Sequence, residues 1–284
     1  MSESSSSYLY IPIHTIFVVG LALSSACLAI RLHSRYRTTN RLDNGELCLL
    51  SSWTLCLTTQ ILILYALDYA GLGFHLNSLD ASTINRYKKL LLIVSCLFVL
   101  GIYLARLSQL LLLHHLVRLL EVQWLRKAIL VITVFTTLGS FILVCCFVFA
   151  CRPISKSWNI VEQGDCISQV ATYISVAVFN ITTDMTLVVL FGVLLWNLPL
   201  SKPDQKKFSI LSLLACITII ASAARLRLTV PLLSSEDLTY AMTPIALLVG
   251  TEMNLIIFVV CLPAVWKFLC TLTMNHESPS SFIS

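Results

Sequence analysis

The chain has 284 residues, and its composition excludes an ordinary soluble protein. Hydrophobic residues make up 57% of the chain and charged residues 12%, whereas soluble domains carry about 25% charged residues. The net charge of +5 comes from scattered Lys and Arg residues, which argues against the basic patch of a nucleic-acid-binding protein. The composition indicates an integral membrane protein, with the lipid bilayer as its partner.

Seven apolar segments are long enough to cross a bilayer, since a membrane-spanning helix needs about 20 apolar residues. Spans are predicted at about 9–30, 47–68, 90–113, 128–150, 169–197, 208–231 and 240–266. We therefore predict an all-α protein with one seven-transmembrane-helix domain over residues 9–268. A short N-terminal segment, 1–8, precedes this domain, and a short tail, 269–284, follows it.

The distribution of Lys and Arg between the connecting segments predicts the orientation of the bundle, because basic loops are retained in the cytoplasm. The richer side holds Arg31, Arg35, Arg37, Arg41, Arg118, Arg126, Lys127, Lys202, Lys206, Lys207 and Lys267. The poorer side holds Arg86, Lys88, Lys89, Arg152 and Lys156. This asymmetry places the N terminus outside and the C-terminal tail in the cytoplasm. Plasma membrane and endoplasmic reticulum both fit this pattern.

Two cysteines differ from the others because they bracket a polar stretch. Cys151 and Cys166, separated by 14 residues, lie in the predicted outer loop after the fourth span. The remaining cysteines fall within or at the ends of apolar runs, where cysteine is a small buried residue. Because the outer side is oxidising, we predict a disulfide between Cys151 and Cys166. No spacing typical of a metal site occurs, and we expect neither a metal nor another cofactor.

Four ionisable residues interrupt the apolar spans. Asp184 and Glu252 lie near the middle of the fifth and seventh spans, and Arg106 and Arg225 lie within the third and sixth. A charge near the bilayer centre costs roughly 2.5 to 3.5 kcal/mol, so such residues are candidates for function. One interpretation pairs Asp184 with Arg106 and Glu252 with Arg225, in salt bridges that fix helix packing.

The other interpretation is a polar site inside the bundle. Asn180, Thr183 and Asp184 share one helix face, and Asn254 lies close to Glu252 in the sequence. Burial favours the neutral form of a carboxyl group, so Asp184 and Glu252 are the candidate catalytic acids if the protein is an enzyme. The candidate polar core that binds a ligand consists of Arg106, Asn180, Asp184, Arg225, Glu252 and Asn254.

Several short motifs occur in order along the spans between about residues 31 and 263. They are Gly71-Leu-Gly-Phe-His75, Arg106-Leu-Ser108, Cys151-Arg-Pro153 with Trp158 and Cys166, Leu195-Trp196-Asn-Leu198, and Cys261-Leu-Pro263. In this order the chain resembles the fungal rhodopsin-like integral membrane proteins. These include Pth-type receptor-like proteins and members encoded in fungal toxin and metabolite gene clusters. The chain departs from the family pattern at Arg106, where lysine is usual, and at Gly45-Glu46, where paired acids are usual.

The resemblance implies that the protein handles a small lipophilic molecule in the biosynthesis of a fungal secondary metabolite, of toxin or meroterpenoid type, or in its sensing. Two alternatives stay open. One is a Pth-type receptor-like seven-helix sensor of an extracellular or membrane ligand. The other is a membrane-embedded cyclase or isomerase that acts on a prenylated substrate, with Asp184 or Glu252 as the general acid.

Two functions of other seven-helix proteins are not expected. A retinal pigment needs a lysine within the last span for the Schiff base, and Lys267 lies at its cytoplasmic end. Coupling to a G protein is not supported by motif, because the third span ends in His114-His115-Leu-Val-Arg118 rather than Asp-Arg-Tyr. A transporter is also disfavoured, since the two halves of the chain show no repeat.

Overall fold

The computed structural model describes residues 3–39, 43–75, 79–119, 122–159, 161–197, 202–233 and 238–276. Seven of its helices are long and apolar enough to cross a membrane, which confirms the predicted all-α seven-helix bundle. Arg41 and residues 277–284 of the predicted tail lie outside the described residues. The side chains of Lys202, Lys206, Lys207 and Lys267 also lie outside them.

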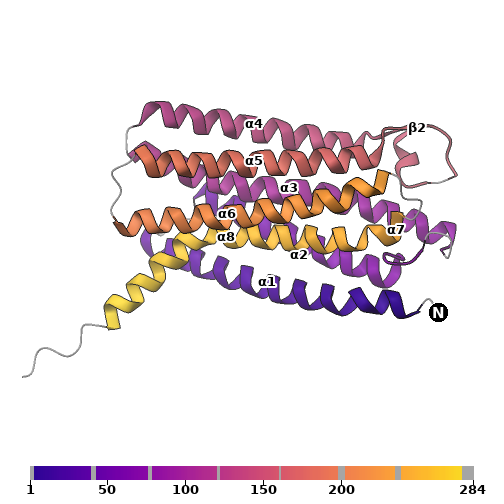
Figure 1. The fold of residues 1–284 in the computed structure, drawn as a ribbon, viewed down its shortest axis with the longest axis horizontal. Coiled ribbons are helices and arrows are strands. Elements are labelled where there is room, and N and C mark those ends of the chain that lie inside the picture. Colours follow the sequence, from indigo (N-terminus) through magenta and orange to yellow (C-terminus); the bar gives the residue numbers. More distant parts are fainter. Residues whose placement is uncertain are drawn as a thin grey trace, which may run out of the picture.

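The long helices lie side by side along the long axis of the bundle, which is horizontal in Figure 1. They are α1 (Glu3–Thr39), α2 (Asn44–Tyr69), α3 (Ala81–Leu119), α4 (Gln123–Val148), α5 (Gln169–Asn197), α6 (Lys202–Thr229) and α8 (Thr243–His276). The short elements are β1 (Cys151–Arg152), η2 (Ile154–Ser157), β2 (Asp165–Cys166), η3 (Val230–Leu233) and α7 (Leu238–Ala241). Helix α1 includes part of the segment that the sequence placed before the first span.

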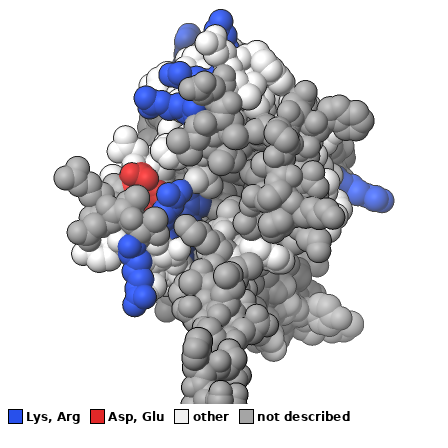
Figure 2. Space-filling view, turned by 90° about the vertical axis from the view of Figure 1, so that its left-hand side faces the viewer, with Lys and Arg blue, Asp and Glu red and all other residues white. Residues whose placement is uncertain are grey.

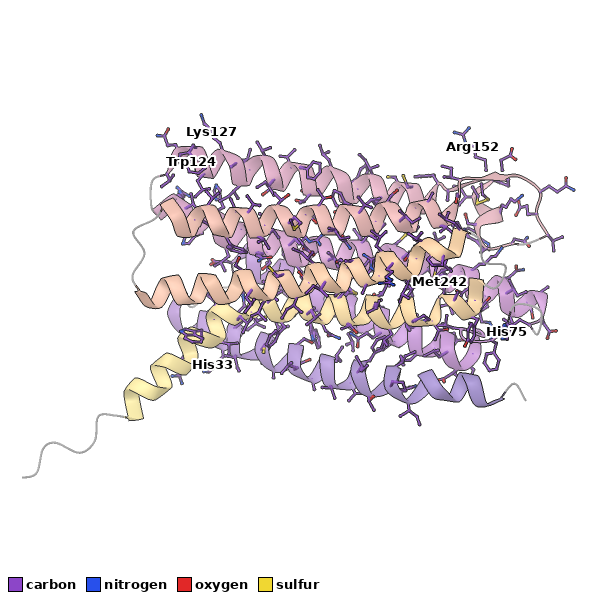
Figure 3. The ribbon with its side chains drawn as sticks, in the orientation of Figure 1. His33, His75, Trp124, Lys127, Arg152 and Met242 are labelled. Carbon is purple, nitrogen blue, oxygen red and sulfur yellow. A yellow bond between two sulfur atoms is a disulfide. The ribbon has the colours of Figure 1, made fainter. Side chains whose placement is uncertain are left out.

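The two ends of the bundle differ in chemistry. One end, which we call the disulfide end, carries β1, β2 and α7; the opposite, basic end carries Arg31, Arg35, Arg118 and Lys127. Figure 3 shows Arg152 and His75 at the disulfide end, and Trp124 and Lys127 at the basic end. Figure 2 faces the basic end, where Lys and Arg side chains are spread over the described surface. Which end faces the cytoplasm stays a prediction.

Helix α8 is the most buried span and α4 the least buried. Apolar side chains cover the outer face of α4, as expected for a helix that contacts lipid; the exposed ones include Val131, Val134, Leu138, Phe141 and Ile142. Inside the bundle, buried apolar residues form three clusters, one near each end and one between them. Because α8 is the most buried span, it is the helix best placed to contribute residues to a site inside the bundle.

Short connections close the disulfide end. A disulfide joins Cys151 to Cys166, and these two residues face each other where β1 pairs antiparallel with β2. The loop between α2 and α3 turns at Gly71 and Gly73, whose φ angles are 74° and 93°; glycine adopts this left-handed region without steric cost. The His75 ring stacks on Tyr240, with ring centroids 4.9 Å apart.

Close packing of α8 against α1 generates the first prediction. A Cβ added at Gly250 would overlap the ring of Phe17, which is only 2% exposed and has little room to move. Gly250→Ala should therefore destabilise the bundle by about 1–3 kcal/mol. Gly192 in α5 has no neighbouring atom within 4 Å of such a Cβ, so Gly192→Ala should be neutral or stabilising by up to about 1 kcal/mol. Thermal unfolding of both variants in detergent measures this difference, and equal melting temperatures would contradict it.

Candidate functional site

Arg106 of α3 is held by two residues of α5. Its Nη2 lies 2.7 Å from Asp184 Oδ1, and the two side chains are 4% and 5% exposed. The guanidinium also donates to the side-chain oxygen of Asn180 at 3.0 Å and to its backbone carbonyl at 3.1 Å. These three predicted site residues therefore form one buried cluster that joins α3 to α5.

Arg225 of α6 makes a second buried ion pair, with Glu252 of α8. Its Nε donates to Glu252 Oε2 at 2.8 Å, and the Ser222 hydroxyl donates to the other carboxylate oxygen. The Arg225 guanidinium lies over the Phe98 ring of α3, 4.8 Å from its centroid. The structure thus places the four ionisable residues as Arg106–Asp184 and Arg225–Glu252, the arrangement of the salt-bridge interpretation.

Asn254 does not join this site, contrary to our expectation. Its side-chain oxygen accepts a hydrogen bond from Ser24 at 3.1 Å and lies 3.6 Å from the Cys56 sulfur, so it faces α1 and α2. The reason is helix geometry: two positions along an α-helix correspond to a rotation of about 200°. Asn254 and Glu252 therefore lie on nearly opposite faces of α8.

A third buried pair was missed by the sequence reasoning. Arg31 and Glu46 are 2% and 3% exposed and approach to 3.2 Å, Arg35 also contacts Glu46 at 3.4 Å, and Arg31 donates to the backbone carbonyl of Val260. We had assigned Arg31 to a loop, but α1 continues to Thr39. The four-residue spacing of Arg31 and Arg35, which puts both on one helix face, was the available signal.

A cavity of about 70 Å³ lies within the half of the bundle nearer the disulfide end. Most of its lining is apolar, from α2, α3, α4, α5, α6 and α8. Met242, one of the lining residues, marks its position in Figure 3. The polar side chains that line it are Tyr87, Ser95, Tyr173, Arg225 and Thr229. The cavity therefore begins at the Arg225–Glu252 pair and extends away from it through an apolar space.

Two polar atoms of the cavity lining lack a hydrogen-bond partner. They are Arg225 Nη2 and the Tyr87 hydroxyl oxygen, and both side chains are nearly fully buried, at 3% and 4% exposed. By contrast, the Ser95 hydroxyl donates to Tyr173. A buried polar group without a partner costs about 1–3 kcal/mol. A ligand oxygen that accepts from either group would remove the cost at that group. No sequence pattern pointed to Tyr87 as a site residue.

The basic end contains a separate polar recess of about 290 Å³. Its lining includes Arg31, Glu46, His114, His115 and Arg118. Among the residues that the structure describes, no group of three or more His, Cys, Asp or Glu side chains is arranged to hold a metal ion.

Similarity to known proteins indicates the family to which the chain belongs. The protein "Fugralins biosynthesis cluster protein 2" of Gibberella zeae is 24% identical to it over 120 residues, which are 42% of this chain and 30% of that protein. The match thus covers less than a third of the relative's length. No solved structure matches the chain. The family model for the fungal rhodopsin domain matches residues 30–271, nearly the whole bundle. The chain belongs to the fungal rhodopsin domain family.

Proposed function

We propose that this protein binds a small lipophilic molecule inside its helix bundle and thereby takes part in fungal secondary metabolism. The observation that carries the proposal is the apolar cavity in which Arg225 Nη2 and the Tyr87 hydroxyl have no partner. An apolar lining with a few convergent polar groups is typical of small-molecule sites. The name of the Gibberella relative, a biosynthesis cluster protein, supports the metabolic context.

The geometry also limits how the molecule binds. About 70 Å³ is less than the roughly 150 Å³ of a cavity that holds benzene, so lining side chains must move apart around a metabolite. Glu252 already pairs with Arg225, which favours an uncharged oxygen, such as a hydroxyl or carbonyl, at the free Nη2. The ligand is thus a mainly apolar molecule with an oxygen acceptor at mid-membrane depth.

Sensing is the second candidate function, and one contact favours it. Arg225 lines the cavity and also pairs with Glu252 of α8, so a ligand at Arg225 acts directly on the contact between α6 and α8. Acid catalysis is disfavoured, because both oxygens of Glu252 accept hydrogen bonds and Asp184 is ion-paired with Arg106. An ion-paired carboxylate has no proton to donate. We propose that the basic end faces the cytoplasm, of either the plasma membrane or the endoplasmic reticulum.

Filling the cavity tests the proposal. Ala246 lines the cavity, whereas Ala223 of α6 is exposed on the outside of the bundle. Three purified proteins in nanodiscs are incubated with a solvent extract of the fungus that encodes the protein: wild type, Ala246→Phe and Ala223→Phe. The molecules that each protein retains are identified by mass spectrometry. Wild type and Ala223→Phe should retain a small molecule that Ala246→Phe loses. Retention of the same molecules by all three would contradict the cavity as the binding site.

The ion-pair assignment of Asp184 is tested by stability. Asp184→Asn leaves the Arg106 charge buried without a counter-ion, which should cost about 3–5 kcal/mol and lower the melting temperature and yield. Adding Arg106→Gln removes that charge and should recover most of the loss. If Asp184→Asn instead keeps wild-type stability and abolishes conversion of a metabolite precursor by fungal membranes, Asp184 is a catalytic acid and the assignment is wrong.

A further inference from the structure

We infer that the ligand is an elongated amphiphilic acid, whose carboxylate is held by Lys88 at the disulfide end while its apolar body fills the cavity. This inference rests on the proposed function and specifies the class of ligand. It assigns Lys88 as a residue that recognises the acid group, and it assigns Arg225 to a second, uncharged oxygen. Three features of the structure lead to it.

The first feature is a small space between the cavity and the disulfide end. It measures about 10 Å³ and lies between α3, α4 and α5, with Lys88 and Gln169 in its lining. Leu91, Phe147 and Tyr173 line both this space and the cavity. The rings of Phe147 and Tyr173 are in contact, with centroids 5.3 Å apart. Movement of these side chains would join the two spaces into one elongated site.

The second feature is the unneutralised charge of Lys88. This side chain is half-buried, and it makes no salt bridge with any acidic residue in the described part of the chain. Burial partly desolvates Lys88, and the like charge of Lys156 also repels it. Lys156 itself donates to the backbone carbonyl of Gly164. Two neighbouring cations without a carboxylate between them attract an anion, and their field favours an acid group at this position.

The third feature is the distance between the two polar ends of the site. Lys88 and Phe98 both lie on α3, and ten residues of α-helix rise by about 15 Å. Because the Arg225 guanidinium lies over the Phe98 ring, Arg225 and Lys88 are about 15 Å apart along the axis of α3. The space between them is lined mainly by apolar side chains. A molecule that satisfies both ends has an acid group, a long apolar segment and a second oxygen.

The two ends prefer different charges. Arg225 is already neutralised by Glu252, so a second carboxylate there would repel the Glu252 charge. Lys88 has no such counter-ion among the described residues and lies in the second turn of α3, near the end of the bundle, where its ligand would keep contact with water. The acid group therefore belongs at Lys88, and the uncharged oxygen belongs at Arg225.

Three probes separate these contributions: ricinoleic acid, which has a carboxylate and a mid-chain hydroxyl; methyl ricinoleate, which lacks the charge; and oleic acid, which lacks the hydroxyl. Their affinities for the full chain in nanodiscs are measured by native mass spectrometry. Lys88→Gln should weaken ricinoleate binding about tenfold, the loss of one hydrogen bond to a charged group, and leave methyl ricinoleate unchanged. Lys88→Arg, which keeps the charge, and Lys89→Gln, which removes an exposed neighbouring charge, should bind as wild type does. Wild type should prefer ricinoleate to oleate, because only ricinoleate offers a mid-chain oxygen to the free Nη2 of Arg225.

The inference is overturned if wild type binds methyl ricinoleate as tightly as ricinoleate, if Lys88→Gln and Lys89→Gln behave alike, or if wild type binds none of the probes. None of these results contradicts the proposed function. That function is tested separately, by whether wild type retains a fungal molecule that Ala246→Phe loses. A ligand of neutral chemistry would give that outcome while refuting the role of Lys88.

Discussion

Buried charge is the constraint on which this bundle depends. Each of three buried arginines meets a carboxylate from another helix. Arg31–Glu46 joins α1 to α2, Arg106–Asp184 joins α3 to α5, and Arg225–Glu252 joins α6 to α8. Rotation of any of these helices would leave a charge without its partner, at a cost of several kcal/mol. Apolar packing against lipid does not discriminate between rotations in this way, because every apolar face is acceptable to the bilayer.

The same constraint shapes the cavity. Glu252, which also accepts a hydrogen bond from Ser222, holds the Arg225 side chain through Nε. This arrangement leaves Arg225 Nη2 at the edge of an apolar space without a partner. An arginine held in this way offers a directed hydrogen bond without a free charge, which suits an uncharged oxygen. Lys88, near the end of α3, has the complementary property of a charge that makes no salt bridge with a described acidic residue. The proposed function would thus use residues that the fold also needs, since the pair that joins α6 to α8 is the inner end of the proposed ligand site.

Much of this arrangement could be predicted from the sequence, because apolar runs and the charges within them are local features of the chain. The length of apolar runs predicts the seven spans, and the depth of Asp184 and Glu252 predicts their arginine partners as one of two interpretations. Arg31–Glu46 was not predicted, because α1 continues beyond its apolar run to Thr39. The prediction that Asn254 joins the polar core was wrong, because its closeness to Glu252 in the sequence was taken to mean a shared helix face. The unpartnered atoms of Arg225 and Tyr87 depend on how several helices meet in three dimensions, which no local pattern contains.

The central claim is that the cavity beside the Arg225–Glu252 pair holds a ligand, and the most direct test is an experimental structure of the protein purified from fungal membranes. The account predicts density for an elongated molecule between Lys88 and Arg225, with an oxygen within hydrogen-bond distance of Arg225 Nη2. The rings of Phe147 and Tyr173 should be displaced around it. A cavity filled by its own side chains, with Arg225 Nη2 bonded to another protein group, would contradict the account.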